Sequence, residues 1–303
     1  MLIKKITLLL LAGVQSISAN SNLITSLTEI VNQVEEKKHK HKKVLNYAFK
    51  QRMRIELIAR DAILLSMNLN NDLYRKEILK NANLFNINFT KLMESKEEID
   101  TAERIDKGFK EELNKLKVTW LEFYKNIQSI SDKKKNKEAL NFIEENNMAL
   151  LNDIDYVFTT FIKAYQSRDK LEASMNHFQT VLYSQVGKPR MYINKLVKER
   201  LFMHTNIHIQ ENKKTLDESI KKMDKLMKGL KDGDKELELN GTEDVEIVKQ
   251  LLVAQNIWEE IKKMVIVNRK LTEKEIEELV NKNNKFITEH TKVVELTRKL
   301  NDM

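Results

Sequence analysis

Turn-forming residues are nearly absent from this chain, which has six glycines and one proline in 303 residues. A β-sheet protein of this length needs turn residues at short intervals, and this chain does not supply them. The hydrophobic fraction of 41% is enough for a packed core, which excludes wholesale disorder. The sequence therefore predicts an all-α protein made of long helices with few breaks.

Apolar residues recur at spacings of three and four along most of the chain, which is the pattern of helices with one buried face. Gly187 and Pro189 are expected to interrupt or kink one of these helices, because proline removes a backbone donor and clashes with the preceding turn. The stretches 132–137 and 229–241 read as loops. The pattern predicts helices at about residues 22–68, 73–98, 102–131, 138–186, 190–210, 215–230, 244–267 and 272–302.

Several landmarks occur twice at a nearly constant offset in the numbering, which indicates an internal duplication. Arg52-Met53 returns as Arg190-Met191 and Trp120 as Trp258, both at an offset of 138. Two further landmarks return at an offset of 137: Asn146-Asn147 as Asn283-Asn284, and Val157 as Val294.

Each unit has about four helices with short connections, so we expect two tandem up-down four-helix bundles, at residues 20–165 and 166–303. The last helix of the first bundle is expected to run on into the second. From residue 150 to 205 it would span roughly 80 Å at about 1.5 Å per residue, and the molecule would be a rod.

Residues 1–19 have the pattern of a secretory signal peptide. Lys4 and Lys5 precede an apolar run at residues 6–14, and small residues follow up to Ala19. The run is too short to span a bilayer, and no later segment is long and apolar enough. We therefore expect a soluble periplasmic protein without a membrane span. The formal net charge is +8. The lysines alternate with glutamates along most helices, which is the usual pattern of a solvated helical face. Together with the expected export, this means that nucleic acid is not an expected partner.

Catalytic motifs are missing from the sequence. It has no glycine-rich phosphate loop, no nucleophile elbow and no cysteine, so we expect neither enzymatic activity nor a cofactor. His204 and His208 have a spacing that suits zinc on one helix, but the glutamate of a metalloprotease pair and an evident third ligand are missing. No metal site is expected. His39 and His41, in a lysine-rich stretch, are interpreted as solvated.

Two arginines fall within apolar stripes, and we predict that both point into a bundle or toward an interface between bundles. A buried guanidinium is costly without partners. Arg52 has Glu56 one turn later, so an internal salt bridge is available. Arg190 has no acid in the flanking turns, and its counter-charge must come from another helix, another subunit or a ligand. A planar oxyanion is a suitable ligand because it accepts two parallel hydrogen bonds from the guanidinium fork.

The other repeated residues have plainer interpretations. Trp120 and Trp258 lie on apolar helix faces and are predicted to be core residues. The paired asparagines are candidates for ligand contacts, for helix caps or for hydrogen bonds between helices.

The stretch Leu45-Asn-Tyr-Ala-Phe-Lys-Gln-Arg-Met53 resembles the opening motif of the type IV pili methyl-accepting chemotaxis transducer N-terminal domain. This is the PilJ-like sensor fold shared with NarX-type nitrate/nitrite sensor kinases. The second copy, Gly187-Lys-Pro-Arg-Met191, resembles the same motif. In the first copy Lys50 stands for an arginine and Phe49 for a glycine. In the second copy Lys188 replaces an arginine and Pro189 a glutamine.

The resemblance implies a periplasmic four-helix sensor bundle in which the motif arginine binds the anion at a dimer interface. Carried over, it names Arg52 and Arg190 as ligands. The rest of the expected site comes from the flanking motif residues Lys50, Gln51, Met53, Lys188 and Met191. A duplicated chain would bring both arginines around one pseudo-twofold site, and a homodimer is the other expectation.

Family members continue into a transmembrane helix and a signalling domain, and this chain is expected to have neither. The expected function is a periplasmic sensor or binding protein for nitrate or nitrite in chemotaxis or signal transduction. It would report to a membrane sensor or chemoreceptor. The alternative is a helical interaction or scaffold protein without a small ligand. The sensor interpretation predicts that Arg52 and Arg190 lie near each other or near a pocket, with too few carboxylates to neutralise them. The second predicts fully paired arginines and an exposed apolar strip.

Overall fold

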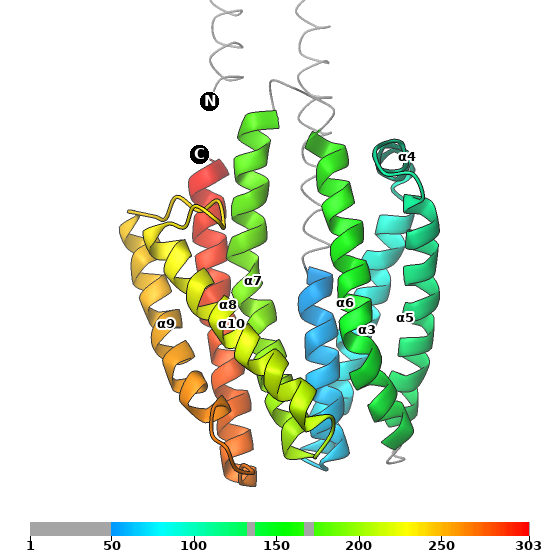
Figure 1. The fold of residues 1–303 in the computed structure, drawn as a ribbon, viewed down its shortest axis with the longest axis vertical. Coiled ribbons are helices and arrows are strands. Elements are labelled where there is room, and N and C mark those ends of the chain that lie inside the picture. Colours follow the sequence, from blue (N-terminus) through cyan, green and yellow to red (C-terminus); the bar gives the residue numbers. More distant parts are fainter. Residues whose placement is uncertain (1–49, 132–136, 167–172, 303) are drawn as a thin grey trace, which may run out of the picture.

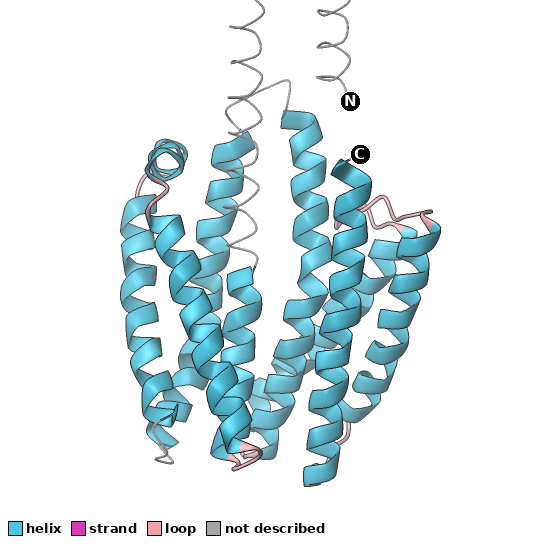
Figure 2. Ribbon diagram, turned by 180° about the vertical axis from the view of Figure 1, so that it is seen from behind, coloured by secondary structure: helices cyan, strands magenta, loops and turns pink. Residues whose placement is uncertain are grey.

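The computed structural model describes residues 50–131, 137–166 and 173–302, and over these residues it has nine helices and no β-strand (Figures 1 and 2). One isolated β-bridge joins Asp234 and Leu239. The all-α prediction is therefore confirmed for this part of the chain. The expected signal peptide, the expected helix over residues 22–49, His39, His41 and the turn at 132–136 lie outside it. The helices are residues 50–66, α3 Asn71–Met93, α4 Lys96–Ile105, α5 Phe109–Ser131, α6 Lys137–Gln166, α7 Ala173–His204, α8 Ile209–Asp232, α9 Val245–Val265 and α10 Glu273–Asp302.

The helices form two groups that lie side by side (Figures 1 and 2). Helix 50–66 and α3 to α6 make the first half, α7 to α10 make the second, and α6 packs against α7. The expected helix shared end to end by two bundles is wrong, because α6 ends at Gln166 and α7 begins at Ala173 alongside it. The expectation of a rod fails with it.

The first half contains a short helix that the apolar pattern did not predict. The second predicted helix ends at Met93 rather than near residue 98, and α4 follows as a separate element. The third predicted helix, over 102–131, is divided before Phe109. Gly108 adopts a φ of 98° there, in a region that favours glycine because it has no Cβ, and the chain turns.

The helix that opens each half ends in the same kind of turn. Asn68 and Asn70 follow helix 50–66 with φ of 59° and 39°, and Asn206 and His208 follow α7 with φ of 63° and 42°. Asparagine tolerates this left-handed region better than most residues. The turn moves two predicted boundaries, because α7 ends at His204 rather than near 210 and α8 begins at Ile209 rather than at 215.

Pro189 does not interrupt its helix. α7 runs without a break from Ala173 to His204 with Pro189 inside it, contrary to the expected interruption. Packing of α7 against α6, α8, α9 and α10 outweighs the local loss of one backbone hydrogen bond.

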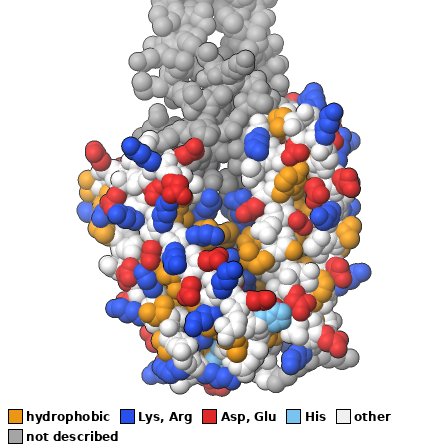
Figure 3. Space-filling model, in the orientation of Figure 1, with side chains coloured by type: hydrophobic (Ala, Val, Ile, Leu, Met, Phe, Trp, Pro, Cys, Tyr) orange, Lys and Arg blue, Asp and Glu red, His pale blue; other side chains and the backbone are white. Residues whose placement is uncertain are grey.

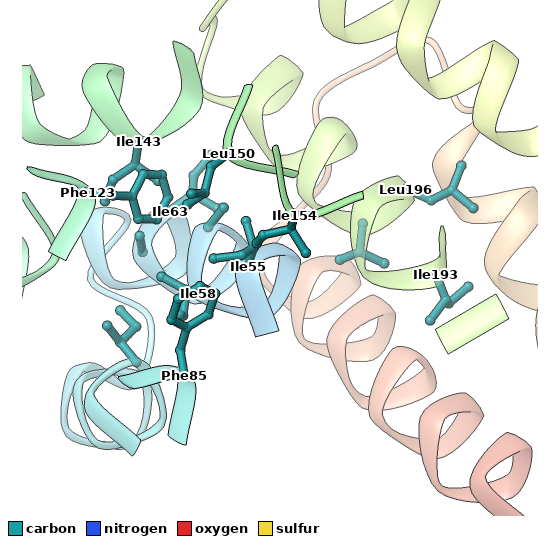
Figure 4. Close-up of a cluster of buried hydrophobic side chains, with 14 of the residues drawn as sticks. Ile55, Ile58, Ile63, Phe85, Phe123, Ile143, Leu150, Ile154, Ile193 and Leu196 are labelled. Carbon is teal, nitrogen blue, oxygen red and sulfur yellow. The ribbon is translucent and has the colours of Figure 1, made fainter. Parts of the chain in front are cut away.

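One connected apolar core runs through both halves. Figure 4 shows Ile55 and Phe85 of the first half within the same cluster as Ile193 and Leu196 of α7. Trp120 and Trp258 are 1% and 0% exposed, which confirms them as core residues.

The two tryptophans also make equivalent hydrogen bonds. Trp120 Nε1 donates to Asn86 of α3 at 2.5 Å, and Trp258 Nε1 donates to Asp224 of α8 at 2.8 Å. Donor and acceptor both keep the offset of 138 between the halves.

Candidate functional site

Helix 50–66 and α7 lie against each other where the two halves meet, and both run toward the lower end in Figure 1. Residues four apart on a helix share a face. On helix 50–66 this face carries Arg52, Glu56 and Arg60. On α7 the residues at an offset of 138 are Arg190, Asn194 and Lys198.

Arg52 is paired with a carboxylate of the protein. Its side chain is buried, and Nε forms an ion pair with Asp155 Oδ1 on α6. The ion-pair partner is therefore Asp155, whereas Glu56, the acid one turn away in sequence, pairs with Lys198 of α7. Burial lowers the pKa of Arg52, and the charge of Asp155 acts against this. Asp155 thus supplies the negative charge that a ligand would otherwise bring.

Arg190 occupies the matching position of the second half without such a partner. Its Nη1 donates to Thr291 Oγ1 of α10 at 3.4 Å, a long hydrogen bond. Within the described residues its buried Nε has no hydrogen-bond partner and its guanidinium no ion pair. Burial lowers the pKa of Arg190, and the charge of the exposed Glu295 acts against this. Gly187 lies next to it, and a Cβ added there would be in van der Waals contact with Nη2, at 3.7 Å.

The two motif lysines lie across the interface, each near the arginine of the other half. Burial lowers the pKa of Lys50, followed by the charges of Arg54, Arg190 and Arg298. Positive charge is therefore concentrated around Arg190, and Figure 3 shows Lys and Arg side chains near the midline between the halves.

Lys188 has a more balanced environment. Burial and the charge of Arg52 lower the pKa of Lys188, and Asp155 raises it.

The remaining motif residues serve the packing of helices. Gln51 is buried, its Nε2 donates to the carbonyl of Phe85 at 2.8 Å, and its Oε1 accepts from Arg54 at 3.0 Å. Met191 is buried and Met53 is half-buried. The structure brings Lys50 to Arg190 and Lys188 to Arg52, and it turns the amide of Gln51 toward α3.

Below the arginines, a buried polar network that the apolar pattern did not predict joins the halves. Lys198 Nζ lies 3.0 Å from Glu56 and 3.3 Å from Glu199, and it donates to Asn147. Burial alone would lower the pKa of Lys198, but Glu199 and Glu56 raise it on balance. The ammonium group therefore stays charged at neutral pH.

The matching contact runs in the opposite direction. Arg60 Nη1 donates to Asn194 of α7 at 3.3 Å and to Asn284 of α10 at 3.0 Å. Arg60 also pairs with the buried Asp61 at 2.6 Å. The offset of 138 that links Arg60 to Lys198 and Asp61 to Glu199 was the sequence signal for this network.

The asparagines make hydrogen bonds between helices. Asn147 donates to the carbonyl of Ile55 at 3.5 Å, and Asn283 donates to Asn194 at 2.9 Å. Asn147 and Asn283 are both fully buried. In the structure Asn147 therefore matches Asn283, at an offset of 136. The match of Asn146-Asn147 with Asn283-Asn284 at an offset of 137, which the sequence suggested, is shifted by one residue.

The same offset of 136 relates Asp155 to Thr291. It also matches Val157 with Val293, both 1% exposed, in place of Val294.

The two histidines with zinc-like spacing do not share a helix. His204 is the last residue of α7, and its Nδ1 accepts from the backbone N–H of Leu271 at 3.2 Å. His208 lies beyond the turn, with Nδ1 3.2 Å from Glu211 and 3.3 Å from Glu144. Across residues 50–131, 137–166 and 173–302 no cluster of three metal-ligating side chains occurs.

No helix in the described part of the chain is long and apolar enough to cross a membrane. Comparison with protein-family models, with characterised proteins and with solved structures found no match.

Proposed function

We propose that this protein is an exported sensor or binding protein for a small oxyanion, nitrate or nitrite, held by Arg190. In this proposal the chain consists of two tandem units of one ancestral four-helix type, the first of which contains the short α4 in addition. A membrane sensor or chemoreceptor would read the occupancy of the site. The motif residues at 45–53 and 187–191, which resemble those of PilJ-like and NarX-like sensors, support the ligand class.

The environment of Arg190 is the observation that carries the proposal. A buried guanidinium nitrogen needs an acceptor, but Nε of Arg190 has none among the described residues, and these residues give its guanidinium one long hydrogen bond, to a threonine hydroxyl. At the equivalent place in the first half, Asp155 neutralises Arg52. A bound anion would neutralise the charge of Arg190 in the way that Asp155 neutralises the charge of Arg52.

The positive charge of the site and the planar fork of its guanidinium favour a planar monovalent oxyanion. Two N–H groups of a guanidinium match two oxygens of nitrate or nitrite in one plane. Lys50 adds a second positive charge from the other half. Because the carboxylate of Asp155 already pairs with Arg52, we expect one anion per chain rather than two.

Thermal unfolding of the purified protein tests the proposal. We expect millimolar nitrate or nitrite to raise the midpoint, because a ligand that binds only the folded state stabilises it by mass action. Sulfate and chloride serve as controls for ionic strength. Equal shifts with all four anions, or no shift with any, would contradict a specific site.

A helical interaction protein is the second candidate, and one surface favours it. Four apolar residues flank the Trp120–Asn86 hydrogen bond on the outer side of α3 and α5: Leu84, Ile87, Val118 and Leu121, between 36% and 66% exposed. Their counterparts at an offset of 138 are polar: Lys222, Lys225, Asn256 and Glu259. At these four positions the exposed apolar side chains occur in the first half only, and exposed apolar residues that lie close together are typical of a contact surface. If no anion binds, this surface becomes the leading functional feature.

A further inference from the structure

A cavity that does not include the arginines opens at the end of the molecule where helix 50–66 and α7 terminate. Its volume is about 570 Å³, which lies within the usual range of roughly 300–1,000 Å³ for small-molecule sites. Both halves line it. Leu65 and Leu140 come from the first half, and Ile207 and Leu271 from the second. A ligand in this cavity would contact both halves at once.

The inner wall of the cavity is apolar. Leu65, Leu140, Ile207, Leu271 and Ile276 line it, and each is at most 8% exposed because it also belongs to the core. An inorganic anion would gain nothing from this wall. An aromatic or aliphatic group would be removed from water there, which is favourable in proportion to the apolar area covered.

The polar part of the cavity is mainly positive. Among the described residues, Arg75, Lys137 and Lys270 line it, against one carboxylate, that of Glu273. Lys137 and Lys270 are exposed and have no ion pair within the described residues, whereas Arg75 has Asp72 at 3.6 Å. The two lysines come from different halves, so an anionic group between them would be held from both sides.

His204 adds a directed hydrogen-bond donor to the wall. Its Nδ1 accepts the backbone N–H of Leu271, so the neutral ring carries its proton on Nε2. Burial lowers the pKa of His204, followed by the charges of Arg200 and Lys270, so the ring is neutral at pH 7. A carboxylate in the cavity would accept from Nε2–H.

We propose that this cavity binds a small organic carboxylate with an apolar body. The carboxylate lies between Lys137, Lys270 and His204, and the body lies on Leu65, Leu140 and Leu271. This site is independent of the oxyanion site at Arg190, and the two have different ligand chemistry. The turns after helix 50–66 and α7 both line the cavity, so a bound ligand would also brace the two halves against each other.

Calorimetric titration of the full chain with 4-phenylbutanoate, and with its neutral amide as a control ligand, tests the proposal. We expect the acid to bind saturably and at least about tenfold more tightly than the amide, because charged hydrogen bonds are the stronger kind. Acetate, which has the same head without the apolar body, should bind more weakly than phenylbutanoate. Equal binding of acid and amide, or no saturable binding, would overturn the assignment.

Charge reversal at the two exposed lysines locates the site. The double variant Lys137→Glu/Lys270→Glu should weaken phenylbutanoate binding at least about tenfold. The matched control Lys249→Glu, an exposed position on α9 outside the cavity, should leave it unchanged. Arg190→Ala should also leave it unchanged, which separates this site from the oxyanion site. Loss in Lys249→Glu or retention in the double variant would contradict the proposed location.

Discussion

Lys198 Nζ lies 3.0 Å from a carboxylate oxygen of Glu56, and both side chains are buried where the two halves of the molecule meet. The matching residues at an offset of 138, Arg60 and Asn194, make the corresponding contact in the opposite direction at 3.3 Å. Lys198 thus reaches from α7 to helix 50–66, and Arg60 reaches from helix 50–66 to α7. These contacts hold helix 50–66 and α7 in register, and they fix the relative positions of Arg52 and Arg190 above them.

Replacement of Lys198 by methionine should strongly destabilise the protein. It would leave Glu56 and Glu199 buried without their cation, and breaking a buried pair in this way typically costs roughly 3–5 kcal/mol. Urea unfolding followed by circular dichroism measures the loss. The control Lys249→Met, at an exposed position, should stay within about 0.5 kcal/mol of the wild type. A loss below about 1 kcal/mol in Lys198→Met would mean that the network contributes little.

His290 should make stability depend on pH. The ring is fully buried and stacks on Phe286, and burial followed by the charge of Arg190 lowers the pKa of His290 from 6.5 to about 3. The unfolded chain binds a proton near pH 6.5 and the folded chain does not. The contribution of His290 is therefore complete above pH 6.5 and is lost as the pH falls toward 3, by about 1.4 kcal/mol per unit.

The variant His290→Leu isolates this effect. Ile154 occupies the matching place in the first half, so an aliphatic side chain fits this position of the fold. Urea unfolding at pH 7, 6 and 5 should show a smaller loss of stability in the variant than in the wild type. Parallel curves for the two proteins would show that His290 titrates normally in the folded state.

Replacement of Asp155 by threonine should create a second anion site. The change gives Arg52 the partner that Arg190 has in Thr291, and it removes the internal carboxylate. Calorimetric titration with nitrate should then give two anions per chain in place of one. The control Asp153→Thr, two positions away on α6, should retain one. A stoichiometry that stays at one in a folded Asp155→Thr would argue against a competing role for the carboxylate.

The sequence predicted the class of fold and the faces that are buried. Apolar periodicity reports which side of a helix is covered, so Trp120, Trp258 and the two arginines were placed on interior faces. It does not report which helix covers them. Asp155 is far from Arg52 in sequence, and their contact depends on how α6 packs against helix 50–66. The side-by-side placement of the halves likewise depends on tertiary packing between α6 and α7.

Local backbone geometry explains the other differences. The break at Gly108 and the left-handed turns at Asn68 and Asn206 depend on single residues whose φ values an apolar pattern does not contain. The buried network could have been predicted from the sequence, because Arg60 and Lys198 are separated by the 138 residues of the repeat. Apolar periodicity alone does not single out charged side chains such as these as buried.

Calorimetric titration of nitrate into the wild type, Arg190→Ala and Arg52→Ala tests the central claim most directly. The account predicts one nitrate per wild-type chain, a similar affinity in Arg52→Ala, and a loss of at least about tenfold in Arg190→Ala, since a bidentate charged contact is removed. Circular dichroism confirms that each variant is folded. Equal binding by the wild type and Arg190→Ala, or loss in Arg52→Ala alone, would contradict the assignment of the oxyanion site to Arg190.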